Sequence, residues 1–230
     1  MELQKFDHVR SFVKRKGHFS DSRKEALDTQ WPIYGLEYDA SKTLNLPEIY
    51  KRQAPVVLEI GFGMGITTAA IAQTNLDVDY LGVEVYSAGV ASLLKLIAEK
   101  KLPNIRAMQH DVFEVVRDML PDNSLSGIHI FFPDPWPKAR HHKRRLVQPD
   151  FVQMLRPKLK TSGYIHCATD WQAYAEHMLE VLSSAPGFSN DSIEPSGYAV
   201  RPSNRPLTKF EDRGIKLGHG VWDLIFQRTA

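Results

Sequence analysis

Five acidic side chains stand at the ends of five short apolar runs in this 230-residue sequence. Glu59 and Glu84 end the first and second runs, and Asp111, Asp134 and Asp170 follow the next three. Ligands of an open α/β sheet bind beyond the carboxyl ends of its strands, so these carboxylates are predicted to share one rim. A single such acid is usually a helix N-cap or a solvated loop residue. Five on one rim indicate a site for a cationic ligand.

A glycine loop follows the first run and precedes a helix start. Gly61, Gly63 and Gly65 allow close backbone approach to a ligand, but the third glycine falls one residue earlier than in the dinucleotide fingerprint. Glu59 at the mouth of the loop would repel a pyrophosphate. S-adenosylmethionine, with a sulfonium, an ammonium and one carboxylate, fits better, and Glu84 is placed to accept its ribose hydroxyls. An NAD-dependent oxidoreductase is kept as an alternative.

The fourth run leads into a stiff, then strongly basic, segment. Prolines 133, 135 and 137 surround Asp134 and fix φ, which predicts a rigidly positioned carboxylate. Residues 138–145, KARHHKRR, then hold five Lys/Arg and no acid, a pattern that suits phosphates. A packed turn and a solvated basic face are the alternatives. The proximity of acidic rim and basic segment favours a site that joins a cationic cofactor to a polyanion.

Short β-branched runs alternate with helical patterns along residues 56–226, which predicts an α/β fold. We expect a Rossmann-like, mostly parallel sheet of about seven strands with helices on both faces. Val90, Leu93, Leu94 and Ile97 form one buried helical stripe. The predicted strands are 56–60, 80–84, 105–109, 127–132, 164–168 and 221–226, and the predicted helices begin at 66 or cover 112–119, 147–158 and 171–184.

Composition places the chain among soluble globular proteins. It has 29 basic and 27 acidic residues, and no apolar run of about 18 residues that could cross a bilayer. Its single cysteine, Cys167, excludes an internal disulfide and suits the reducing cytoplasm. That shortage of ligands, with His141 and His142 in a basic run, predicts no metal site. Residues 1–50, polar and broken, are predicted to be a basic N-terminal arm and docking segment, and residues 51–230 a single domain.

Several motifs together resemble one known family over nearly the whole chain. They are RSFVKR at 10–15, GFGMG after VVLEI, PDPWPK leading into RHHKRR, Thr169-Asp170, TKFE at 208–211 and GHGVWDL at 218–224. This set resembles the bacterial tRNA (guanine-N7-)-methyltransferases. The resemblance implies a class I methyltransferase fold and transfer of the methyl group of S-adenosylmethionine to N7 of a guanine in the tRNA variable loop, which forms 7-methylguanosine.

The resemblance also implies residue roles. Cofactor positions match Glu59, the glycines at 61, 63 and 65, Glu84, Asp111 and Asp134, and Asp134 is also the implied catalytic residue. Substrate positions match Lys138, Asp170, Thr208, Lys209, Phe210 and Glu211. The implied RNA-contacting stretch is Arg140, His141, His142, Lys143, Arg144 and Arg145. The partner is then tRNA, without membrane or metal, and the chain is a monomer or a homodimer.

The chemistry of such a transfer leaves several alternatives open. N7 of guanine carries an in-plane lone pair, so no base is needed, and alignment accounts for most of the task. Asp134 could bind the guanine Watson–Crick edge or orient the cofactor ammonium, and Trp136 or Phe210 could stack on the base. The rival functions are a non-catalytic tRNA-binding protein on the same fold, the oxidoreductase, and a methyltransferase for a protein or small molecule.

Overall fold

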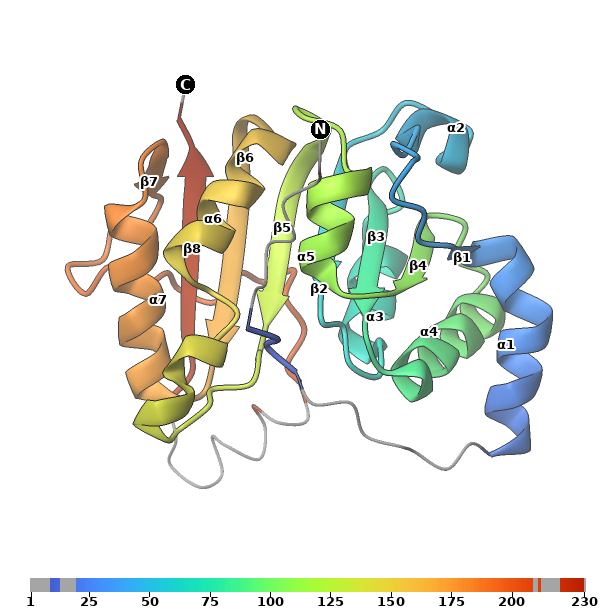
Figure 1. The fold of residues 1–230 in the computed structure, drawn as a ribbon, viewed down its shortest axis with the longest axis horizontal. Helices are drawn as coiled ribbons and strands as arrows, with labels where there is room; N and C mark the ends of the chain where they lie inside the picture. The colour runs from blue at the N-terminus through green and yellow to red at the C-terminus, as the bar shows by residue number, and fades with distance from the viewer. Residues whose placement is uncertain (1–8, 13–19, 209–210, 212–219, 230) are drawn as a thin grey trace.

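A computed structural model describes residues 9–12, 20–208, 211 and 220–229 (Figure 1). Its centre is an eight-stranded sheet with the strand order β1-β4-β3-β2-β5-β6-β8-β7. The strands are β1 (Gly35–Leu36), β2 (Val56–Ile60), β3 (Asp79–Glu84), β4 (Ile105–Gln109), β5 (Leu125–Phe131), β6 (Leu159–Thr169), β7 (Phe188–Asn190) and β8 (Trp222–Arg228).

The first six strands in this order run parallel, and β8 and β7 pair antiparallel at one edge. The carboxyl ends of β2, β3, β4 and β5 therefore meet at one edge of the sheet, as the sequence predicted. β5 and β6 are also in register there, with Phe131 opposite Ala168. The predicted α/β class and mostly parallel sheet are confirmed.

Helices cover both faces of the sheet, because its central strands are apolar on both sides. In β2, Val56 and Leu58 belong to one core cluster and Val57 to the other. The first cluster includes side chains of α2, α5, α6 and α7, and the second those of α3 and α4. The bounds are α1 (Asp21–Tyr34), α2 (Leu46–Tyr50), α3 (Ile66–Thr74), α4 (Ser87–Lys100), α5 (Val112–Glu114), α6 (Pro149–Leu155) and α7 (Gln172–Ser184).

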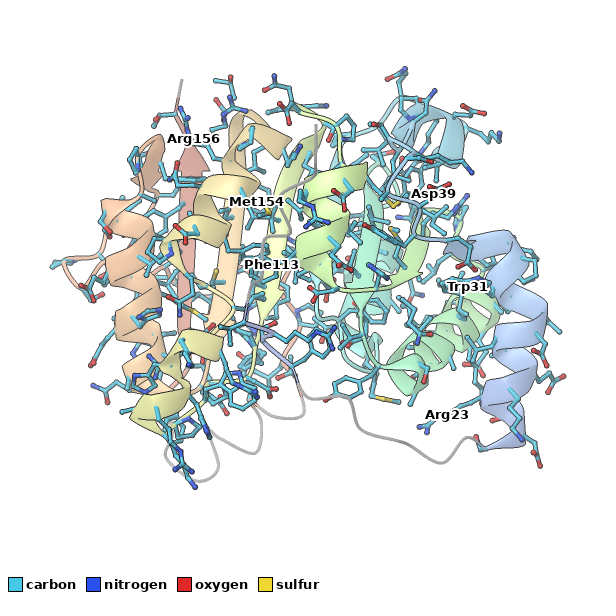
Figure 2. The ribbon with its side chains drawn as sticks, in the orientation of Figure 1. Arg23, Trp31, Asp39, Phe113, Met154 and Arg156 are labelled. Atoms are coloured by element: carbon cyan, nitrogen blue, oxygen red, sulfur yellow. The ribbon has the colours of Figure 1, made fainter. Side chains whose placement is uncertain are left out.

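Two of these helices illustrate how the pattern produces the packing. The predicted stripe of α4 is fully buried, with Val90 and Ile97 both 0% exposed. On the other face, Phe113 of α5 packs on Phe151 of α6 with ring centroids 4.2 Å apart, and Figure 2 shows Phe113 over the middle of the sheet. The described residues also include a π-helix at Val115–Met119 and the 3₁₀ helices η2 (Ala139–Arg144) and η3 (Arg156–Lys158).

The segment before residue 51 is more ordered than its broken pattern indicated. α1 packs against α4 at the side of the molecule (Figure 1), β1 joins the sheet beside β4, and the Tyr50 hydroxyl donates to the Tyr80 carbonyl at 2.8 Å. Only Ala26 of α1 is buried, so this helix has little apolar periodicity to reveal it. The division into an arm and a domain at residue 50 stays a prediction.

Three further observations concern the described part of the chain. None of its helices is long and apolar enough to cross a membrane. Within the same residues, no group of three or more His, Cys, Asp or Glu could hold a metal ion. Cys167 is a free, buried thiol in β6, and burial raises its pKa to about 12.

Candidate functional site

A pocket opens at the carboxyl ends of β2, β3, β4 and β5, where the sequence analysis placed the acidic rim. Three of the five predicted carboxylates, Glu84, Asp111 and Asp134, line it, and no Lys or Arg does so among the described residues. The other lining residues are the two loop glycines 61 and 63, Ser11, Phe12, Ile60, Val83, Val85, Tyr86, His110, Val112, Phe132, Pro133 and Leu146. The pocket thus combines apolar walls with negative charge.

The glycine loop has the backbone that its sequence predicts. Gly61, Gly63 and Gly65 all have positive φ, at 71°, 56° and 71°. A side chain would be strained at such φ, and the first two glycines present their backbone to open space in the pocket. Gly89 of α4 has a different role, since a Cβ there would lie 2.1 Å from the Gly63 carbonyl oxygen. Its lack of a side chain lets α4 support the loop from behind.

Glu84 closes β3 and braces this loop. Its Oε2 accepts from Gly63 N at 2.9 Å, and its Oε1 accepts from the backbone N–H groups of Val85 and Tyr86 at 2.7 and 3.0 Å. Burial raises the pKa of Glu84, although these three hydrogen bonds lower it in part. The carboxylate is fixed at the pocket wall, which agrees with the predicted place of Glu84.

Glu59 differs from its neighbours on the rim. It is 2% exposed, it is not among the pocket-lining residues, and its Oε2 has no hydrogen-bond partner among the described residues. Burial raises its pKa to about 7. A buried carboxylate oxygen without a partner costs free energy, so it is a candidate to accept a hydrogen bond from a ligand or a water.

Asp111 and Asp134 reach the pocket from neighbouring loops. Asp111 is the N-cap of α5 and accepts from Phe113 N at 3.1 Å. Asp134 is solvent-exposed at the rim, and its negative charge contributes to the raised pKa of Glu84. A bound cation would reduce the electrostatic repulsion between two carboxylates that face one pocket.

The loop that carries Asp134 is strained as well as proline-rich. Phe132 and Trp136 have φ values of 52° and 45°, a region that non-glycine residues seldom adopt. Such residues cost about 1–3 kcal/mol each and persist where the surroundings fix them. Phe132 N donates to the Ala168 carbonyl at 2.7 Å, which ties the loop to β6.

Trp136 is engaged within the protein. Its indole Nε1 donates to the Ser11 carbonyl at 3.1 Å, and the Arg144 guanidinium lies 4.8 Å from its ring. This contact holds Ser11 and Phe12 at the pocket, an N-terminal contribution that the sequence analysis missed. Stacking of a base on Trp136 or Phe210 stays a prediction, and Phe210 lies outside the described residues.

The basic stretch divides into exposed and buried members. Lys138, Arg140 and Lys143 are exposed, and His141, His142 and Arg144 are half-buried. Arg145 is only 4% exposed: its Nε donates to the Pro135 carbonyl at 3.0 Å and its Nη1 to the Ala173 carbonyl at 3.3 Å. In this structure the Arg145 side chain thus fixes the Asp134 loop to α7, and its contact with RNA stays a prediction.

The predicted substrate residues also differ in how far they are exposed to solvent. Asp170 follows β6 at the carboxyl edge and is half-buried, as is Thr208. Glu211 is 1% exposed, and its carboxylate accepts from Arg205 and from Thr208 N. Lys209 lies outside the described residues. A direct substrate contact of Glu211 stays a prediction, and its carboxylate in this structure serves an internal ion pair.

Two residues beside this set were missed from the sequence. Arg205 is buried between Glu211 and Asp223, and nothing in its spacing distinguishes it from an exposed arginine. Trp171 is 42% exposed directly after Asp170. Its position next to a predicted rim acid was the available signal.

Comparison with solved structures defines the class of fold. The 16S rRNA methyltransferase KamB aligns over 97% of this chain and 99% of its own with a TM-score of 0.56 and 16% identity. The aminoglycoside resistance methyltransferase NpmB1 gives 0.52 and 16%, with 80% and 92% of the chains covered. The [4+2]-cyclase SpnF gives 0.54 and 14%, with 77% and 75% covered. The fold is that of the methyltransferases, and the cyclase shows that this fold alone does not determine the reaction.

Sequence comparison narrows the class. The family model described as "Putative methyltransferase" matches residues 53–224. A tRNA (guanine-N(7)-)-methyltransferase of Dechloromonas aromatica is 55% identical over 97% of this chain and 89% of its own. One of Chromobacterium violaceum is 56% identical over 96% of both chains. The chain belongs to the tRNA (guanine-N(7)-)-methyltransferase family.

Proposed function

We propose that this protein transfers the methyl group of S-adenosylmethionine to N7 of a guanine in the variable loop of tRNA. One observation carries the proposal: an acidic, glycine-backed pocket without Lys or Arg among its described lining residues adjoins an exposed basic turn. The two features share the loop around Asp134, which lines the pocket and runs into Lys138. A cationic methyl donor and a polyanionic acceptor would thus meet at one edge of the sheet.

The residues present fit S-adenosylmethionine. Glu84 and Asp111 are placed for polar groups of the nucleoside, and Val83 and Val112 supply apolar surface for a purine. The open space in front of Gly63 is where the amino-acid portion would be held, and Glu59, whose buried Oε2 has no partner among the described residues, lies near the end of β2 next to this glycine loop. When bound, this cofactor supplies an electrophilic methyl group on a positively charged sulfur.

The same pocket does not suit a nicotinamide dinucleotide. A pyrophosphate needs backbone N–H groups that are free, but Gly63 N donates to Glu84. The charges of Glu84 and Asp134 would also repel a pyrophosphate at short range in a partly buried site. These contacts weigh against the oxidoreductase alternative, and an unobstructed acidic pocket weighs against a tRNA-binding protein without catalysis.

Asp134 is the proposed catalytic residue. The nucleophile N7 needs no deprotonation, so a carboxylate contributes by position and charge, not as a base. Positive charge develops on the guanine as the methyl group arrives, and a fixed carboxylate stabilises it. The backbone around Asp134 has a fixed shape, with positive φ at Phe132 and Trp136. The hydrogen bond from Arg145 to the Pro135 carbonyl holds this loop in place. Binding of the guanine edge and binding of the cofactor ammonium both agree with this position.

Calorimetry with the purified chain tests the pocket assignment. S-adenosylhomocysteine and S-adenosylmethionine should bind, and NAD should not. Glu84→Gln should weaken cofactor binding, whereas Glu180→Gln, an exposed change on α7, should leave it as in the wild type. Binding of NAD with no response to either methionine derivative would contradict the proposal.

A further inference from the structure

A buried arginine joins the segment that carries Glu211 to the sheet. Arg205 Nε and Nη2 donate to Asp223 at 2.7 and 2.8 Å, and its Nη1 and Nη2 donate to Glu211 at 2.7 and 2.6 Å. These three side chains are 1 or 2% exposed. One guanidinium therefore holds two carboxylates in the fork geometry that lysine cannot reproduce.

Each of the two carboxylates also has a hydrogen-bond partner other than Arg205. Asp223 lies on β8 opposite Ala168 of β6, and its Oδ1 is 2.7 Å from His166 Nε2. Glu211 accepts from Thr208 N at 3.0 Å, and Glu211 N donates to Thr208 Oγ1 at 3.1 Å. This reciprocal pair of hydrogen bonds has the pattern of a capping box and joins Thr208 to Glu211. Arg205 thereby connects a sheet strand to the paired residues Thr208 and Glu211.

The guanidinium also contacts the start of the Asp134 loop. Its Cζ lies 5.9 Å from the Phe131 ring centroid and 5.7 Å from that of Phe132. Phe132 is one of the two loop residues with positive φ. The same side chain thus contacts Asp223 of β8, Glu211 and the base of the Asp134 loop.

We propose that Arg205 is a positioning residue that holds Glu211, with its partner Thr208, and the Asp134 loop in one arrangement around the target nucleotide. This inference rests on the proposed function. Buried ion pairs add little net stability, because desolvation offsets their attraction. A requirement for geometry explains why two buried carboxylates converge on this arginine. A displacement of about 1 Å at a reacting centre can lower a rate about 100-fold.

The test compares Arg205→Lys with a matched control, Arg52→Lys. Arg52 also pairs with a buried carboxylate, Asp79, through Nε at 3.0 Å and Nη2 at 2.6 Å, but Asp79 begins β3 at the opposite edge of the sheet. Each variant is assayed for thermal unfolding, for affinity for S-adenosylhomocysteine, and for kcat and KM with tRNA. Both substitutions remove a fork and keep a positive charge.

The two variants should separate in the kinetic measurements. Arg205→Lys should lower kcat/KM for tRNA about 10- to 100-fold with cofactor affinity within about twofold of the wild type, and Arg52→Lys should lose thermal stability alone. Equal kinetics in the two variants would overturn the inference. Should Arg205→Lys not fold, Asp223→Asn loosens Arg205 from the strand side and should show the same kinetic loss; wild-type kinetics there would also overturn it. Failure of the wild-type chain to methylate tRNA would instead contradict the proposed function.

Discussion

Glu59 and Asp134 are carboxylates at the same edge of the sheet, and their surroundings assign them different roles. Glu59 is buried without a partner for Oε2, whereas Asp134 is exposed at the pocket rim. Burial penalises the charged form of Glu59 and raises its pKa. Asp134 is accessible to a substrate at the pocket rim, whereas Glu59 is enclosed by the protein.

Replacing Asp134 tests the catalytic assignment. Asp134→Ala should lower kcat about 10²- to 10³-fold, because it removes a charge that stabilises the transition state. Binding of tRNA, measured by filter retention, should change little, since a carboxylate does not attract phosphates. Loss of tRNA binding with turnover preserved in the bound fraction would contradict this role.

The raised pKa of Glu59 predicts a pH dependence of stability. The folded protein holds a proton on Glu59 up to about pH 7, above the ordinary glutamate pKa. Between the ordinary glutamate pKa of 4.5 and about pH 7 the native state binds more protons than the unfolded chain, so the free energy of unfolding falls over this range and levels off above it. Glu59→Gln should lack this fall, and its stability relative to wild type should increase between pH 5 and pH 8 in the absence of cofactor.

Chemical denaturation at these two pH values measures the effect. Glu180→Gln, an exposed change on α7, is the control and should show no such trend. A relative stability of Glu59→Gln that is constant across this range would show that Glu59 is charged in the folded protein without cofactor.

At the scale of elements, the loop 132–136 and the turn η2 act as one unit. Arg145 hydrogen bonds to Pro135 and Ala173, so it fixes the loop to α7, whereas Arg140 and Lys143 are exposed to solvent. Arg144 stacks on Trp136, which in turn holds the N-terminal Ser11. The turn thus places positive charge beside the pocket, and Arg145, directly after the turn, supports the Asp134 loop.

This division predicts different effects for neighbouring substitutions. The double variant Arg140→Ala/Lys143→Ala should weaken tRNA binding and reduce the slope of log affinity against log salt by about one per residue. Lys51→Ala/Lys160→Ala, exposed residues near the amino ends of β2 and β6, is the charge-matched control and should keep the slope. Arg145→Ala should instead lower the unfolding temperature. An unchanged slope in the first variant would remove η2 from the interface.

The elements with strong periodicity were predictable, and those held by tertiary contacts were not. The structure contains the predicted strand 56–60 and the predicted buried stripe of α4, because the spacing of apolar residues along the chain determines which of these side chains are buried. α1 has one buried residue and β1 only two residues, so neither has a local signal. β6 extends from Leu159, five residues before the predicted start, through a polar stretch that periodicity does not identify as strand.

The site was predictable where chemistry follows strand ends. Glu84, Asp111 and Asp134 meet at the pocket because parallel topology brings those ends together. The burial of Arg145, and the pairing of Glu211 with Arg205, depend on contacts between residues distant along the chain or on opposite sides of a turn. A basic residue in a basic run gives no sequence signal of being buried.

At the scale of the whole molecule, the positions of the charges are more informative than the net charge. The net charge is only +2, yet an acidic pocket and an exposed basic turn lie next to each other beyond the strand ends. Cationic cofactor and anionic RNA would each be attracted to its own part of this edge, which aligns donor and acceptor before reaction. The hydrogen-bond network around Arg205 connects the Asp134 loop, which contributes to this edge, to Asp223 of β8.

The most direct test of the account is the position of the transferred methyl group. The purified chain is incubated with methyl-labelled S-adenosylmethionine and tRNA, and the product is treated with borohydride and aniline, which cleave at 7-methylguanosine. We predict scission at one variable-loop guanosine, and no labelling when that nucleotide is replaced by 7-deazaguanosine. Label that survives this replacement, or that enters tRNA without creating a scission site, would contradict methylation at N7.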